Sequence, residues 1–177
     1  MPELVKWWDA ADGRWMSLRR GLWRDGGRAG RREWTHSKMA AAVAIARTLD
    51  GRWVLVREWR AALGGWCIQF PGGVVVEGED PMDAAARECW EETGRRVLSV
   101  EADGLQPMAT SPGLTDEEVW FFRCAVEDEP SAAGLRDDAI ASAAFAVRPE
   151  DLAGFLRASR ARGDRVCCWL LAALPCP

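Results

Sequence analysis

The segment from residue 72 to residue 95, GGVVVEGEDPMDAAARECWEETGR, constrains the fold more than any other part of the 177-residue chain. Its glycine pair follows a proline, and this combination must interrupt regular structure. Asp80 and Pro81 then form a helix start, because aspartate caps a helix and proline suits its first turn. The pattern predicts a helix that runs through MDAAARECWEET and stops at Gly94, a natural C-terminal residue.

Three glutamates converge on this predicted helix. Glu88, Glu91 and Glu92 fall within an arc of about 100° on one face, where their like charges repel. A solvated acidic face is the alternative interpretation, but acids near a helix C-terminus oppose the helix dipole. Arg87 can brace the carboxylates, Glu79 can add an acid from the loop, and the glycine pair lets a backbone carbonyl approach. Donors that are all oxygen suit Mg²⁺ or Mn²⁺ rather than zinc, so the pattern predicts a divalent-metal site.

The rest of the chain indicates mixed strands with two or three helices. Apolar runs at residues 40–46 and 53–56 flank the turn LDGR and predict a hairpin, and GWCIQF, VWFFRCAVE and IASAAFAV predict further strands. RPEDLAGFLRASRARGD and the apolar C-terminal stretch predict helices. The first thirty-odd residues, rich in Trp, Arg and Gly, are expected to form short strands or an irregular arm. Together these elements predict one α+β domain with a sheet covered by helices.

Composition excludes several classes of function. A net charge of −4 with scattered arginines argues against a nucleic-acid partner. No window reaches the ~18 apolar residues of a membrane helix and no signal peptide is visible, so a cytoplasmic protein without a membrane partner is expected. His36 is the single histidine, which disfavours a His-based metal site or a Ser-His-Asp triad. The six cysteines lack metal-site spacing and are expected to be reduced, so catalysis must rest on carboxylates and arginines.

Residues 73–95 resemble the Nudix box. The family pattern is Gly, five residues, Glu, seven residues, Arg-Glu, an aliphatic residue, any residue, Glu-Glu, any residue, Gly and an aliphatic residue. Its glycine and charged positions are all met, by Gly73, Glu79, Arg87, Glu88, Glu91, Glu92 and Gly94. Cys89 and Arg95 replace aliphatic residues, and Val76 stands where many members carry an extra Glu. The resemblance implies a Nudix fold, an α/β/α sandwich with a mixed β-sheet between helices, over residues 35–177, preceded by an arm over residues 1–34.

The resemblance covers roughly residues 35–156 and is greatest to the ADP-ribose pyrophosphatase branch. VLVREWRAALGGWCIQFPGG is similar to that branch's strand, which ends in an aromatic-Arg pair and leads to E-hydrophobic-P-A-G. Here Gln69 replaces the acid and Gly72 the alanine. ATSPGLTDEE resembles a loop whose proline marks a preference for ADP-sugars. The residues implied to contact the substrate are Arg60, Gly73, Pro112 and Gly113.

The resemblance also implies a mechanism, in which water attacks one phosphorus of a diphosphate with the help of Mg²⁺ or Mn²⁺. Glu88 and Glu92 are then the principal ligands of the metal. Glu91 and Glu79 are additional ligands or supports, the Gly72 carbonyl is a backbone ligand, and Arg87 orients the carboxylates. The general base is expected in GLRDDAI, at Asp138 or Asp137. The alternatives for the base are Glu127, Asp128 and Glu129.

The implied substrate is a nucleoside diphosphate sugar, with ADP-ribose first, cleaved to a nucleoside monophosphate and a sugar phosphate. One alternative is a Nudix hydrolase of a dinucleoside polyphosphate, a coenzyme-type diphosphate or a damaged nucleotide. Another is a non-catalytic module that senses a nucleotide sugar, which the intact box argues against. Trp34 or Trp66 could stack on the base, and His36 is expected to be structural. By resemblance the N-terminal arm would contribute to a homodimer.

Overall fold

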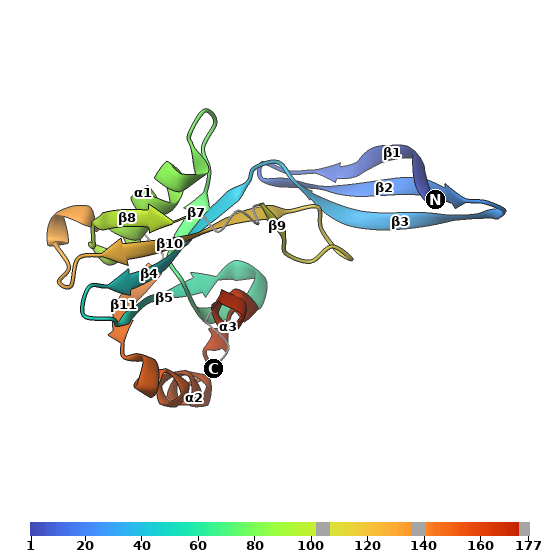
Figure 1. Cartoon of the computed structure of the whole chain (residues 1–177). Coiled ribbons are helices and arrows are strands. Elements are labelled where there is room, and N and C mark those ends of the chain that lie inside the picture. The colour runs from blue at the N-terminus through green and yellow to red at the C-terminus, as the bar shows by residue number, and fades with distance from the viewer. Residues whose placement is uncertain (102–106, 136–140, 174–177) are drawn as a thin grey trace.

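The computed structural model describes residues 1–101, 107–135 and 141–173, which form two β-sheets and three α-helices (Figure 1). A three-stranded antiparallel sheet stands apart as an arm and contains β1 (Glu3–Asp12), β2 (Met16–Asp25) and β3 (Arg28–Ser37). The rest of the described chain forms a mixed nine-stranded sheet with helices on both of its faces. The predicted α+β class, with a mixed β-sheet between helices, is confirmed.

The arm is more regular than the sequence suggested. The prediction of short strands or an irregular segment is wrong, because each of the three strands is ten residues long. Cross-strand contacts between arginine and tryptophan stabilise this sheet, with Arg19 lying 4.1 Å from the centre of the Trp7 ring and Arg32 5.2 Å from that of Trp23. Such side chains favour strands without the apolar alternation of a half-buried sheet, and that alternation was the signal sought in the sequence.

The main sheet begins with the predicted hairpin of β4 (Ala41–Thr48) and β5 (Trp53–Arg60). The two strands share only the register pair Arg47–Trp53 next to the turn and then diverge. Strand β4 pairs with β7 (Gly72–Val74) and, in parallel, with β10 (Glu118–Val126). Strand β5 pairs with β6 (Gly65–Gln69) and β11 (Ala141–Val147). The sheet therefore opens between β4 and β5.

Shorter strands extend the sheet, and helices cover its two faces. Strands β8 (Val97–Glu101) and β9 (Met108–Ala109) pair with β10, and β12 (Arg165–Val166) pairs with β6. Helix α1 (Pro81–Thr93) covers one face, and α2 (Leu152–Ala161) and α3 (Cys168–Ala173) cover the other (Figure 1). The 3-10 turns are η1 (Ala61–Leu63), η2 (Ala132–Gly134) and η3 (Pro149–Asp151). The predicted strands in GWCIQF, VWFFRCAVE and IASAAFAV and the helix after residue 148 are confirmed.

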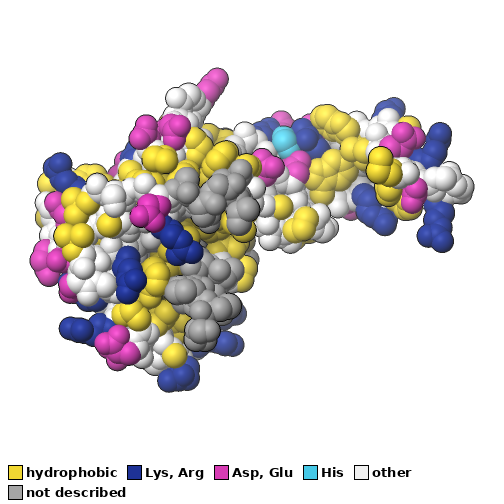
Figure 2. Space-filling view, viewed as in Figure 1, with side chains coloured by type: hydrophobic (Ala, Val, Ile, Leu, Met, Phe, Trp, Pro, Cys, Tyr) yellow, Lys and Arg dark blue, Asp and Glu magenta, His cyan; other side chains and the backbone are white. Residues whose placement is uncertain are grey.

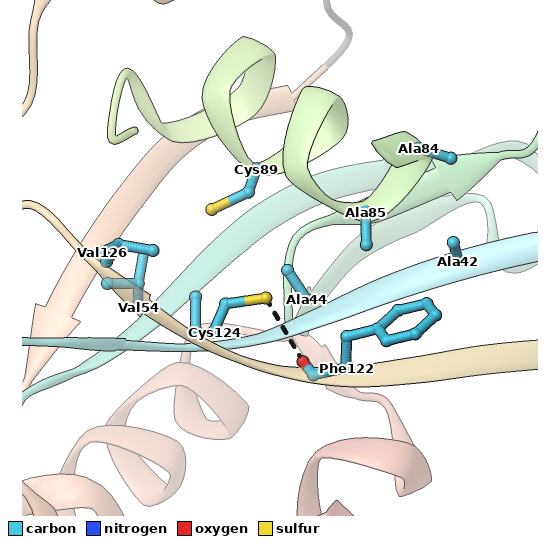
Figure 3. Packing of buried hydrophobic residues seen from close by; sticks show 10 residues of the cluster. Ala42, Ala44, Val54, Ala84, Ala85, Cys89, Phe122, Cys124 and Val126 are labelled. Carbon is cyan, nitrogen blue, oxygen red and sulfur yellow. Dashed lines mark hydrogen bonds between the residues drawn. The ribbon is translucent and has the colours of Figure 1, made fainter. Parts of the chain in front are cut away.

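Alternation along β4 builds a separate core on each face of the sheet. Ala42 and Ala44 are fully buried beneath α1, where they meet Ala85 and Cys89 (Figure 3). The intervening Val43 belongs to the second core, which includes residues of α2 and α3. Because the α1 interface is made of such small side chains, the helix lies close to the sheet, and this closeness fixes the position of its glutamates.

Helix α1 has the ends that the sequence predicts. The Asp80 carboxylate accepts a hydrogen bond of 2.8 Å from the Met82 N–H, and Pro81 occupies the first turn. At the other end Gly94 adopts a left-handed conformation with φ of 66° and donates its N–H to the Trp90 carbonyl. The predicted extent of the helix is confirmed.

Two other predictions concern cysteines and membranes. The cysteines that the structure describes are free thiols, with Cys67, Cys89 and Cys124 buried, whereas Cys176 lies outside the described residues. None of the described helices has the length and apolar character needed to cross a membrane.

Overpacking the α1 interface tests this account of the fold. Ala85→Leu should lower the free energy of unfolding by about 1–3 kcal/mol, because the fully buried alanine faces backbone and small side chains that cannot move apart. Urea titration followed by circular dichroism measures the change. Ala158→Leu, at an exposed position of α2, is the matched control and should leave stability nearly unchanged. Equal effects of the two substitutions would contradict the close packing of α1.

Candidate active site

The acidic face of α1 is organised around one cation, Arg87. Its guanidinium binds both carboxylate oxygens of Glu79, with N–O distances of 2.8 and 2.9 Å. The same group lies 2.7 Å from Glu88 and 3.3 Å from Glu91, and it also donates to the Val74 carbonyl at 3.1 Å. The hydrogen bonds from Arg87 hold the pKa of Glu79 below its ordinary value. Arg87 therefore contacts three of the four box glutamates and, through Glu79, ties the loop that precedes α1 to the helix.

Glu92 has a different environment from the other three glutamates. Its carboxylate accepts a hydrogen bond of 3.0 Å from the Gly72 N–H. Burial raises the pKa of Glu92 to about 8, and the nearby charges of Glu58 and Glu88 add to the effect. A buried carboxylate among other carboxylates is an electrostatic cost that a bound cation would remove.

Two glycines allow β7 to lie against the helix and the sheet. A Cβ atom on Gly73 would lie 2.6 Å from the carboxyl carbon of Glu88, and one on Gly72 would lie 2.5 Å from the Ala42 carbonyl oxygen. The contact at Gly72 is with backbone and excludes a side chain, whereas at Gly73 the Glu88 carboxylate would have to move aside. The glycine pair therefore lets the strand lie close to its neighbours, and it brings peptide groups next to Glu88 and Glu92.

The donor set fits a hard divalent cation, although the side chains do not form a complete shell. Across residues 1–101, 107–135 and 141–173, no group of three or more His, Cys, Asp or Glu side chains is gathered in a ready metal-ion shell. The side chains do not form such a shell because Glu79, Glu88 and Glu91 instead form ion pairs with Arg87. The carboxylates of Glu88 and Glu92 next to the glycine peptides nevertheless offer oxygen ligands, and burial together with neighbouring carboxylates raises the pKa of Glu92.

A pocket of about 570 Å³ lies next to the glycine pair, where β4 and β5 diverge. Its polar lining comes from Arg60, Gln69 and Glu117, and its edge includes Gly72 and Gly73. The apolar lining includes Phe70, Trp169 and Leu170. The pocket thus combines an arginine with an apolar wall, and Gly72 and Gly73 relate it to Glu92 and Glu88 of α1. Its size falls in the range of roughly 300–1,000 Å³ that small-molecule sites occupy.

A family model described as the NUDIX domain matches residues 37–170. The chain belongs to the Nudix family. The matched region begins at the end of β3 and reaches α3, so it contains the whole main sheet, the box and the pocket. The family membership predicted from the box is confirmed.

Curated relatives cover the Nudix region in part. The chain is 35% identical over 113 residues to the methanol dehydrogenase activator of Bacillus methanolicus, covering 63% of this chain and 60% of that protein. It is 34% identical over 96 residues to the ADP-ribose pyrophosphatase of Bacillus subtilis (strain 168), covering 54% and 50%. It is 38% identical over 84 residues to the ADP-sugar pyrophosphatase of Mus musculus, covering 45% and 38%. The chain spans about half the length of these relatives.

A solved structure matches more of the Nudix chain. The crystal structure of an ADP compounds hydrolase superposes with a TM-score of 0.67 and covers 92% of this chain and 95% of that one. The sequence identity is 16%, so this match establishes the shared fold alone.

Sequence reasoning missed Glu58, a further carboxylate at the Nudix site. Burial raises the pKa of Glu58, the ion pair with Arg60 opposes that rise and the charge of Glu88 adds to it. Glu58 accepts a hydrogen bond of 2.9 Å from the Gln69 amide and lies 2.7 Å from Arg60. A charged residue within the apolar strand VLVREWR, two residues from Val56 and therefore on the same face, was the signal that could have identified it.

The predicted substrate loop lies against the arm rather than inside the pocket. Pro112 and Gly113 are exposed and are not part of the pocket lining given above. The Thr35 N–H donates to the Leu114 carbonyl at 2.9 Å, which fixes the loop to β3. Glu117, at the end of this loop, does line the pocket.

Asp116 adds a second connection between the loop and the arm. It accepts hydrogen bonds from the Ser37 N–H at 3.0 Å and from the Trp34 indole at 3.3 Å, and it lies 2.8 Å from His36 Nδ1. Burial alone would raise the pKa of Asp116, but the hydrogen bonds from His36 and Ser37 outweigh it and lower the pKa. His36 thus has a structural contact, as the sequence suggested, and Trp34 makes a polar one.

The remaining predicted residues lie elsewhere. Asp137 and Asp138, the expected general bases, lie outside the described residues. Of the alternatives, Glu127 accepts from the Arg96 N–H and Asp128 from the Asp50 N–H. Glu129 is 3.8 Å from Arg52. These three acids lie in the chain that follows β10 and are not part of the pocket lining. Trp66 packs against Arg57, whose guanidinium carbon is 4.2 Å from the ring centre.

The raised pKa of Glu92 predicts a pH dependence of stability. Because the folded metal-free chain holds this proton more tightly than the unfolded chain does, the contribution to stability is complete below the ordinary pKa of 4.5 and is lost as the pH rises through about 8. Glu92→Gln should therefore unfold at a higher urea concentration than the parent at pH 8.5 in EDTA, and the two should converge near pH 5.

Glu91→Gln is the control for this experiment, because it changes a neighbouring box glutamate and leaves Glu92 in place. This variant should keep the pH dependence of the parent. A Glu92→Gln variant that loses stability with rising pH as steeply as the parent would show that Glu92 is not the responsible group.

Proposed function

We propose that this Nudix protein is a Mg²⁺-dependent pyrophosphohydrolase that cleaves the diphosphate of a nucleoside diphosphate sugar, with ADP-ribose as the preferred substrate. The observation that carries the proposal is the convergence of Glu88 and Glu92 beside Gly72 and Gly73, at the edge of a pocket that also contains Arg60. Relatives named as an ADP-ribose pyrophosphatase and an ADP-sugar pyrophosphatase support this choice of substrate class.

Each residue of the box has a distinct role in the proposal. Glu88 and Glu92 hold the metal, with Glu79 and Glu91 as supports and the Gly72 carbonyl as a backbone ligand. Mn²⁺ could replace Mg²⁺, since both prefer oxygen donors. Bound there, the cation supplies positive charge that offsets the charge of the diphosphate in the transition state and makes water a better nucleophile. Arg87 keeps the carboxylates in place through charge-assisted hydrogen bonds.

The reaction itself is a hydrolysis of a phosphoric anhydride. A water oxygen forms a bond to one phosphorus, the bond from that phosphorus to the bridging oxygen breaks, and the bridging oxygen leaves with the other phosphate. Arg60, half-exposed at the pocket, binds the non-bridging phosphate oxygens. Asp138 remains the proposed acceptor of the proton from water, and Pro112 and Gly113 the proposed contacts of the substrate loop.

Removal of one metal ligand tests the proposed activity. Glu92→Gln should lower kcat for ADP-ribose by at least about 100-fold, as expected for the loss of a group that stabilises the transition state. The measurement is release of AMP and ribose 5-phosphate with saturating Mg²⁺. Glu77→Gln, at an exposed position of the loop before α1, is the control and should retain the parent rate.

A panel of substrates distinguishes the proposal from its alternatives. Fastest turnover of a dinucleoside polyphosphate or of a coenzyme-type diphosphate would replace the substrate but keep the chemistry. Full Mg²⁺-dependent turnover by Glu92→Gln would refute the role of the metal site. Binding of ADP-ribose without hydrolysis would instead indicate a nucleotide-sugar-binding module.

We also propose that residues 1–34 act at the interface of a homodimer, with residues 35–177 as the catalytic domain; the proposed boundary falls within β3. Every residue of β1 is exposed, including the apolar side chains of Leu4, Trp7 and Trp8. Figure 2 shows hydrophobic side chains gathered on the arm among its arginines. Exposed tryptophans on an edge strand are unfavourable in water and suit contact with a second chain.

A charge placed on the arm tests the dimer. The double variant Trp7→Glu, Trp8→Glu should convert a dimer into a monomer, because burying two carboxylates at the interface costs more than the apolar contact contributes. Light scattering after size-exclusion chromatography measures the mass. Leu49→Glu, at an exposed turn of the main domain, is the control and should remain dimeric. A parent protein that is monomeric at all concentrations would contradict the interface.

A further inference from the structure

The charged end of β5 lies on the face of the sheet that is covered by α1. Val54 is buried in the α1 core, and alternation places Val56, Glu58 and Arg60 on the same face. The antiparallel register sets Gln69 of β6 opposite Val56. Gln69 is therefore the diagonal neighbour of Glu58, within reach of its side chain.

One oxygen of Glu58 holds two partners. Glu58 Oε2 lies 2.7 Å from Arg60 Nη2 and accepts a 2.9 Å hydrogen bond from Gln69 Nε2. The Glu58 side chain is 18% exposed, whereas that of Arg60 is 43% exposed. Among the described residues, Arg60 has no other ion-pair partner, so one edge of its guanidinium is fixed and its other N–H groups remain available to a ligand.

Glu58 stands behind the pocket rather than in it. Arg60 and Gln69 both contribute to the pocket lining, and Glu58 is not among the described residues that do so. A group in this position acts on a ligand through the side chains that it holds. Besides burial, the charge of Glu88 raises the pKa of Glu58, and the charge of Glu58 raises that of Glu92, so the three carboxylates lie close together.

We propose that Glu58 is a positioning residue that, steadied by Gln69, holds the Arg60 guanidinium in the orientation that binds the diphosphate of the substrate. The inference rests on the proposed function and deepens it by assigning substrate affinity to a side chain outside the box. Arg60 is flexible when unpaired, and the ion pair removes part of the entropy that it would otherwise lose on binding.

A double-mutant cycle tests whether Glu58 acts through Arg60. Glu58→Gln should raise the KM for ADP-ribose about tenfold with kcat within about twofold of the parent, because an oriented charge-assisted contact is lost from both the ground and transition states. In the Arg60→Gln background the same substitution should change KM by less than about twofold. The Mg²⁺ concentration for half-maximal rate should stay unchanged in both.

Controls separate positioning from a merely structural role. Glu33→Gln breaks an exposed Glu–Arg ion pair of 2.6 Å on the arm, outside the pocket lining, and should leave KM unchanged. Glu58→Asp keeps the carboxylate one methylene shorter and should give a KM between those of the parent and Glu58→Gln. The dissociation constant of a methylene-bridged ADP-ribose analogue, measured by calorimetry, should follow the same order without any turnover.

The outcomes are distinguishable. Effects of Glu58→Gln and Arg60→Gln that multiply would overturn the inference, since Glu58 would then act independently of Arg60. An unchanged KM with a raised Mg²⁺ requirement would overturn it in favour of a role at the metal. A parent chain that binds the analogue but hydrolyses no diphosphate would contradict the proposed function. The double-mutant cycle measured on binding of the analogue would still decide the role of Glu58.

Discussion

The contact of Arg87 with the box glutamates is the interaction on which the rest of the site depends. Without this cation the carboxylates of Glu79, Glu88 and Glu91 would repel one another, and the loop before α1 would lose its attachment to the helix. The hydrogen bond from Arg87 to the Val74 carbonyl extends the same attachment to β7. The strand then lies close to the helix, and a side chain at Gly73 would displace the Glu88 carboxylate. Local charge pairing and close backbone packing therefore depend on each other, and together they set the edge of the pocket.

Local chemistry explains which parts of the site were predictable from the sequence. The helix and its caps follow from Asp80, Pro81 and Gly94, and the convergence of the glutamates follows from helical periodicity alone. Glu58 was not predicted because its contacts depend on the pairing of β5 with β6, which a single sequence does not reveal. Its hydrogen bond to Gln69 places a carboxylate and an amide side by side, so the acid absent at Gln69 has a counterpart on the neighbouring strand.

The fold shows the same division between local and long-range information. The β4–β5 hairpin was predictable from its turn, but the separation of the two strands after the turn depends on partners far along the chain, β10 for one and β11 for the other. The arm was mispredicted for a physical reason. Its strands are stabilised by stacking of arginine on tryptophan, as in Arg19 over Trp7, and so they lack the apolar alternation that marks a strand against a core.

Hydrogen bonds connect the arm to the loop that leads into the pocket, and residues of both segments form them. Asp116 accepts from the Ser37 N–H and contacts His36, while the Thr35 N–H donates to the Leu114 carbonyl. The loop that makes these contacts continues into Glu117, which lines the pocket. A displacement of β3 must therefore either break these hydrogen bonds or move the loop with it. Because several short, directed hydrogen bonds would have to break together, carrying the loop along is the less costly response. The position of the arm thus bears on the shape of the pocket even though the arm contributes no residue to its lining within the described chain.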